Sequence, residues 1–125
     1  MERSIIMIKR VIPLGAIFFF FVLVMFNGYA FGASAEENYQ FYCAQCHGVK
    51  GKGDGPNATE TQPVSPRDHT NTKEMKKLTD EDIINVIKSG GAATSKSTLM
   101  PPFGKTLTEK EIQELKDYLR KLCKC

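Results

Sequence analysis

The 125-residue sequence predicts an all-α protein with three main helices and two long loops. Three observations lead to this prediction. No segment shows the alternation of apolar and polar residues that is typical of a half-buried strand. Two segments, starting at Thr79 and Thr108, begin with capping boxes and continue with apolar residues at helical spacing. Glycine and proline concentrate in the stretches between the predicted helices.

The first predicted helix covers residues 36–47, where tyrosines and cysteines recur at i, i+3, i+4 and i+7 and so share one face: Tyr39, Tyr42, Cys43 and Cys46. From Gly48 to Thr70 the chain contains four glycines and three prolines, which predict a loop. A short helical turn is expected over 72–77.

The second main helix follows Thr79, which forms a capping box with Asp82, and Gly90-Gly91 is expected to end it. A second loop covers 92–107. The last helix follows the capping box of Thr108 and Glu111, and its apolar stripe is Ile112, Leu115, Tyr118, Leu119 and Leu122.

Composition separates the first 35 residues from the rest. They contain 24 of the 52 apolar residues, which leaves 28 in the 90 residues of 36–125, or about 31%. Such a lean segment with two long loops makes a poor core, so a large apolar ligand is expected to complete it. The net charge of +3 for the whole chain is too small to indicate a nucleic-acid binder.

Residues 1–35 have the features of a secretory signal peptide. Basic residues at the start precede an uncharged run with an apolar centre, and Ala33-Ser34-Ala35 fits the A-x-A cleavage pattern. Cleavage after Ala30 is the weaker second site, and an uncleaved membrane anchor is the alternative. The domain at 36–125 is therefore expected to be exported to the periplasm, and it would contact the membrane only through an uncleaved leader.

Cys43-Ala44-Gln45-Cys46-His47 is the C-x-x-C-H attachment sequence of c-type haem. Two cysteines three residues apart on a helix can bond the two vinyl groups, while the adjacent histidine ligates the iron from the same side. A Cys43–Cys46 disulfide, or zinc bound by this motif and a terminal cysteine, are the alternatives.

The segment Cys43 to Pro56 resembles the haem-binding segment of bacterial class I c-type cytochromes, and Leu99-Met100-Pro101-Pro102-Phe103-Gly104 resembles their distal-ligand loop. Pro66-Arg67-Asp68 and Leu78-Thr79-Asp80-Glu81 also fit small monohaem members. The resemblance implies a class I cytochrome c fold of three to four helices, with long loops wrapped around one covalently attached haem. It also implies electron transfer between redox partner proteins.

The same resemblance implies that His47 is the proximal iron ligand and Met100 the distal one. The prolines after Met100 would stiffen its loop. Met75 is the other methionine in 36–125, and we expect it to be half-buried packing. The resemblance further implies that the carbonyl of Pro56 accepts a hydrogen bond from His47.

Arg67 and His69 are candidates for a contact with a haem propionate, and exposed loop positions are the alternative. Lysines flank the two motif loops and could line an exposed haem edge, although scattered, solvated lysines are the default interpretation: Lys50, Lys52, Lys96 and Lys105.

Cys123 and Cys125 depart from the family pattern. A disulfide between residues two apart would be strained and is not expected. Three interpretations stay open: disulfides to another chain, incidental thiols at a frayed end, or a thiolate that ligates iron in place of Met100.

The leading functional hypothesis is therefore a periplasmic carrier of single electrons on one covalent haem c, not an enzyme by itself, although it could be the haem subunit of a larger oxidoreductase. The alternative is a haem protein that binds NO or CO, or a low-potential cytochrome, with a thiolate or displaceable distal ligand. This alternative protein could be one subunit of a dimer joined through Cys123 and Cys125.

Overall fold

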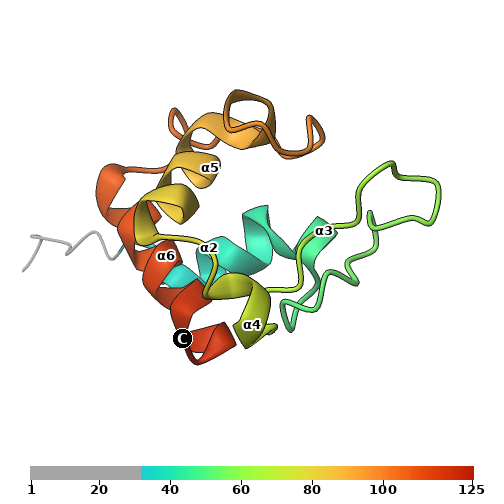
Figure 1. The fold of residues 1–125 in the computed structure, drawn as a ribbon. Helices are drawn as coiled ribbons and strands as arrows, with labels where there is room; N and C mark the ends of the chain where they lie inside the picture. The colour runs from blue at the N-terminus through green and yellow to red at the C-terminus, as the bar shows by residue number, and fades with distance from the viewer. Residues whose placement is uncertain (1–31) are drawn as a thin grey trace, which may run out of the picture. The chain divides into compact units, whose positions relative to one another are not determined.

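A computed structural model describes residues 32–125, and the expected leader therefore lies almost entirely outside the described residues. Within 32–125 the regular structure is helical and includes no strand, which confirms the predicted fold class. Figure 1 shows these helices joined by two long loops. No helix in this part of the chain is both long and apolar enough to cross a membrane.

The expected helix at 36–47 is two helices, α2 (Ala35–Tyr42) and α3 (Ala44–His47). They meet at Cys43, whose φ of −112° departs from the helical value of about −63°. Ser34 caps α2 in a capping box with Glu37. Cleavage after Ala35 would therefore remove the cap of α2, whereas cleavage after Ala30 would keep it.

The expected helical turn is α4 (Thr72–Met75), and the second main helix is α5 (Asp80–Ala93). Thr79 and Asp82 form the predicted capping box. Gly90 has a φ of 78° and interrupts the helical backbone, so the regular part of α5 ends where the two glycines predicted it. One further turn follows this kink.

The last helix, α6 (Glu109–Cys123), begins at the capping box of Thr108 and Glu111. Near its end the Arg120 guanidinium donates to the carbonyls of Met75 and Leu78 and pairs with Asp80. One side chain thus ties α6 to the connection between α4 and α5.

The C-terminus contains the disulfide that the sequence did not lead us to expect, because Cys123 and Cys125 are bonded to each other. Lys124 takes the left-handed conformation (φ 53°, ψ 45°), which turns the chain back at the end of α6. This turn brings the two Cα atoms to 5.3 Å, within the usual range for a disulfide. Cys123 is fully buried, so it is not an incidental thiol at a frayed end.

Helix α6 packs against α2, α4 and α5, and its inward face supplies Ile112, Leu115 and Leu119 to the core. At the crossing with α2 the ring of Tyr118 lies 5.2 Å from that of Tyr39, which is fully buried. Tyr42 of α2 packs edge-on against Phe103 of the second loop. The core therefore lies between α6 and the other helices, and α2 is fixed in place for the motif that follows it.

Candidate haem site

A cavity of about 550 Å³ opens between the helices, which is the size range of a small-molecule or cofactor site. Its walls come from α2, α3, α4, α5, α6 and both long loops. Much of the lining is apolar, for example Ile83, Ile87, Phe103 and Leu119. Val64 and Leu99 line the same cavity and are 56% and 52% exposed, so they mark where it reaches the surface. A large, mainly apolar ligand suits this space.

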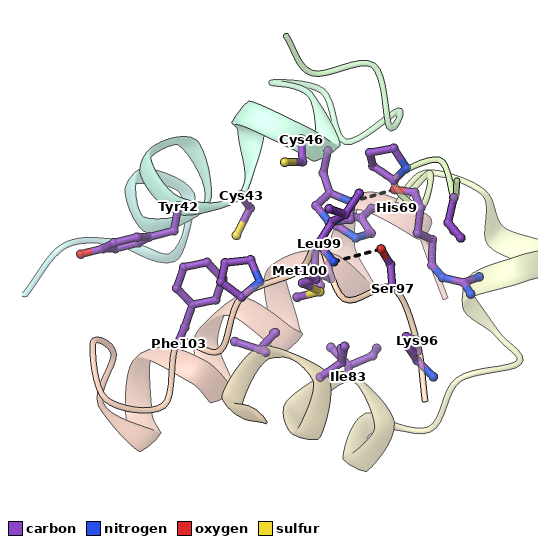
Figure 2. A pocket seen from close by; sticks show the side chains of 18 of the residues that line it. Tyr42, Cys43, Cys46, His69, Ile83, Lys96, Ser97, Leu99, Met100 and Phe103 are labelled. Carbon is purple, nitrogen blue, oxygen red and sulfur yellow. Dashed lines mark hydrogen bonds between the residues drawn. The ribbon is translucent and has the colours of Figure 1, made fainter. Parts of the chain in front are cut away.

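Both motif cysteines line the cavity, and neither is in a disulfide. Figure 2 shows Cys43 and Cys46 on the α2–α3 side, with Ile83 rising from α5 across the space. Burial, reinforced by the nearby Cys46, raises the pKa of the Cys43 thiol to about 12, so this thiol is uncharged at neutral pH. The alternative Cys43–Cys46 disulfide is absent from the described structure.

His47 also lines the cavity, and its ring has a fixed tautomer. Its Nδ1–H donates to the carbonyl of Arg67 at 3.0 Å, because a carbonyl can only accept. Burial is the main cause that lowers the pKa of His47, so the imidazole is neutral. The other nitrogen, Nε2, then keeps its lone pair, which is the state that ligates a metal.

The acceptor of this hydrogen bond corrects the sequence prediction, which assigned it to Pro56. Arg67, 20 residues beyond His47, supplies the carbonyl instead. The chain after the motif folds back on itself before it reaches Pro56: Gly53 N–H donates to the His47 carbonyl and Gly55 N–H to that of Cys46. The later segment around Arg67 approaches the His47 ring instead.

Gly55 shows why this return requires glycine. A Cβ at this position would lie 2.4 Å from the Gln45 carbonyl oxygen and 2.5 Å from that of Ala44. Both are backbone atoms, which cannot rotate away. The glycine-rich sequence after C-x-x-C-H thus lets the loop lie directly on α3 and support the backbone of His47.

Met100 lines the cavity from the second loop. Its carbonyl accepts a hydrogen bond from the Gly91 N–H at 3.0 Å, and Phe103 and Gly104 donate to the carbonyls of Ile87 and Lys88. The loop is therefore docked on the end of α5, just after the kink at Gly90. A Cβ at Gly90 would lie 2.9 Å from the Met100 oxygen, so the kink and the close approach occur at the same residue.

Met75 lines the cavity as well and is 1% exposed, which corrects the expectation of half-buried packing. Cys123 and Cys125 do not line it, and both sulfurs are used in their mutual disulfide. The structure therefore does not place either cysteine where it could replace Met100. Among residues 32–125 no group of three or more histidine, cysteine or acidic side chains is arranged to hold a metal ion, so the zinc alternative has no support there.

The sequence indicated His69 only as a candidate for a propionate contact or as an exposed loop residue. In the structure it is one of the most buried polar residues of the site. It is 7% exposed, lines the cavity and stacks on His47 with ring centroids 4.1 Å apart and an interplanar angle of 18°. Burial is the main cause that lowers its pKa to about 3. A histidine between Asp68 and Thr70 in a polar loop carries no local sign of burial. Arg67 and Lys96 reach the cavity too, whereas Lys50, Lys52 and Lys105 do not line it.

The residues present fit a covalently attached haem. Two free thiols three residues apart lie on one wall, beside a neutral histidine with an available Nε2. A thioether lines the same cavity from a separate loop, and apolar side chains form much of the remaining surface. Thiols, imidazole, thioether and an apolar lining together match the chemistry of haem c.

Comparisons with known proteins agree with this assignment. A family model described as cytochrome c oxidase, cbb3-type, subunit III matches residues 30–119. A solved structure described as KustC0563 c-type cytochrome has a TM-score of 0.57 and 27% sequence identity to this chain, and the similarity covers 72% of this chain and 98% of that one. A search of curated proteins found no match.

Proposed function

The chain belongs to the cbb3-type cytochrome c oxidase subunit III family of c-type cytochrome domains, and on this premise we propose that it is an exported carrier of single electrons. Membership implies one covalent haem c, electron transfer rather than catalysis by the domain itself, and redox proteins as partners. When bound, the haem iron supplies the one-electron couple. The observation that carries the proposal is the convergence of Cys43, Cys46, His47 and Met100 on one cavity.

The proposed roles follow from how each side chain is held. Cys43 and Cys46 would attach the haem, and His47 would bind the iron through Nε2 because its Nδ1–H is donated to the Arg67 carbonyl. Met100 would be the distal ligand, since its loop is docked on α5 and its side chain lines the cavity. A thioether opposite an imidazole raises the reduction potential and closes the iron to small ligands, which suits a carrier rather than a gas binder.

The exposed mouth of the cavity is the proposed exit for the electron. Val64 and Leu99 lie there half exposed, and Lys96 lines the same cavity. Outside the first 35 residues the chain carries 14 basic and 13 acidic side chains, so steering of a partner would depend on where the charges lie rather than on net charge. Export is proposed from the leader-like residues 1–35.

The test is to express the full chain in a bacterium that assembles c-type haem, and to fractionate the cells. We expect a covalent haem by mass spectrometry, location in the periplasmic fraction, and a redox titration that fits one electron. The reduced protein should keep its spectrum under CO. Loss of haem on denaturation in organic solvent, or a CO complex formed at once, would contradict the proposal.

The family description favours a second candidate, the electron-entry subunit of a terminal oxidase. It differs from the first in its partner rather than in its chemistry. Purification of the tagged chain from the membranes of its native cells distinguishes the two candidates. A subunit would co-purify with oxidase activity in a fixed ratio, whereas a free carrier would not.

A further inference from the structure

His69 lies against the residue proposed to bind the iron, although the proposed function gives it no role. Its ring is nearly parallel to that of His47, with centroids 4.1 Å apart and an interplanar angle of 18°. The two rings are therefore face to face. This is close contact between two flat side chains, one of which has to keep a fixed orientation.

His69 is itself held at two points. Its backbone N–H donates to the Gly51 carbonyl at 2.6 Å, and its Nδ1 shares a hydrogen bond of 3.1 Å with the Tyr39 hydroxyl. Tyr39 is fully buried and packs on Tyr118 of α6. The His69 ring is thus connected through Tyr39 to the packed crossing of α2 and α6.

Two contacts restrain the orientation of the His47 ring, a hydrogen bond and a stacked ring. The hydrogen bond from Nδ1 to the Arg67 carbonyl restrains the ring at one atom, and a rotation of the ring plane about the line from Nδ1 to that oxygen would leave the bond intact. A flat partner on one face removes that rotation, because turning the imidazole would drive its edge into the neighbouring ring. His69 is placed on that face.

We propose that His69, held by Tyr39, is a positioning residue that sets the rotation of the His47 imidazole about its bond to the haem iron. This inference rests on the proposed function, since it concerns the ligand of a bound haem. The rotation of an axial imidazole decides which iron d orbitals its π system overlaps. It therefore controls the magnetic anisotropy of the oxidised iron and the pattern of paramagnetic shifts of the haem methyl groups.

The test uses holoprotein variants and reads the NMR shifts of the haem methyl groups and the EPR g values of the oxidised state. His69→Leu removes the flat partner, so we expect a changed order or spread of the methyl shifts and altered g values. His69→Phe restores a flat ring and should return the pattern towards that of the wild type. Tyr39→Phe removes only the hydroxyl and should shift the pattern less than His69→Leu does.

Ile112→Val is the matched control, because Ile112 is fully buried but does not line the cavity. It should lower stability slightly and leave the spectra unchanged. Spectra of His69→Leu and Tyr39→Phe that both equal the wild type would overturn the proposal, and if His69→Leu does not fold, an unchanged Tyr39→Phe spectrum does the same. Failure of the proposed function is a separate result, since it would show in the wild type as a protein without haem.

Discussion

The two sides of the haem cavity are held in different ways. On the proximal side the loop after His47 returns onto α3 through several backbone hydrogen bonds, and Arg67 and His69 close over the histidine ring. On the distal side the backbone of the Met100 loop is hydrogen-bonded to the end of α5, where it lies close to Gly90 and Gly91, and Phe103 of this loop packs on Tyr42. The proximal ligand is thus supported by backbone hydrogen bonds within its own loop and by Arg67 and His69, whereas the loop of the distal ligand is held by backbone hydrogen bonds mainly at its junction with α5.

Substitutions on the two sides of the cavity should therefore have different effects. A change in the proximal loop has to disturb packed backbone, so it should affect folding and haem attachment as a whole. A change at the α5 junction should release Met100 while the covalent attachment and His47 persist. Stability and ligation are therefore expected to respond separately on the two sides.

The largest loss of stability is expected from Gly55→Ala. The added Cβ would meet the Gln45 and Ala44 carbonyl oxygens at 2.4 and 2.5 Å, so the loop must move away from α3. We expect a loss of about 3 kcal/mol in the free energy of unfolding and a low yield of holoprotein. Urea unfolding measures the first and haem content the second. Lys52→Ala, at an exposed position of the same loop, is the control and should behave like the wild type.

Gly90→Ala should break the distal junction. Its φ of 78° is unfavourable for alanine, and the Cβ would lie 2.9 Å from the Met100 oxygen. The expected loss is about 2 kcal/mol. More tellingly, part of the oxidised protein should lose methionine ligation while haem content stays normal. Ala93→Ser, at an exposed position near the end of the same helix, is the control. Full methionine ligation in Gly90→Ala would show that the junction does not hold Met100.

Lowering the pH should reduce the stability of the folded protein through His69, on the proximal side of the cavity. Burial is the main cause that lowers its pKa from 6.5 to about 3. Between these values the unfolded chain binds the proton and the folded protein does not, so stability falls as the pH falls, by up to about 1.4 kcal/mol per pH unit. Between pH 7 and 5 the wild type should lose about 2 kcal/mol more than His69→Phe in urea unfolding of the holoprotein. Equal losses would mean that His69 is protonated in the fold.

The smallest losses of stability are expected from substitutions at the N-terminal caps of α2 and α5, one helix on each side of the cavity. Ser34→Ala and Thr79→Ala each remove a capping side chain, from α2 and α5, at a cost of about 1 kcal/mol. The Ser34 effect requires that the exported protein still contains Ser34. Sequencing the N-terminus of the exported protein therefore accompanies the unfolding measurement. A mature chain that starts at Glu36 would show that the cap is lost in processing, and Ser34→Ala would then change nothing.

The sequence predicted features whose cause is local. The capping boxes at Thr79 and Thr108, and the end of regular helix at Gly90, depend on residues within one turn of each other. The C-x-x-C-H motif likewise predicts that its cysteines and histidine share a side of the chain. These elements formed as predicted because short-range hydrogen bonds decide them.

What the sequence did not predict depends on where distant segments meet. Arg67 rather than Pro56 accepts the His47 hydrogen bond because of the path of a 20-residue loop, which no spacing rule fixes. His69 is buried by Tyr39 and His47 from other parts of the chain. The Cys123–Cys125 disulfide depends on one backbone conformation, that of Lys124, which allows a separation of only two residues.

The most direct test concerns the two axial ligands. Oxidised iron bound by a thioether has a weak long-wavelength charge-transfer absorption, which is measured by absorption or magnetic circular dichroism. We expect this band in the wild-type holoprotein and in Met75→Leu, and its loss in Met100→Ala. Absence of the band from the wild type, or its loss in Met75→Leu together with its survival in Met100→Ala, would contradict a haem held between His47 and Met100.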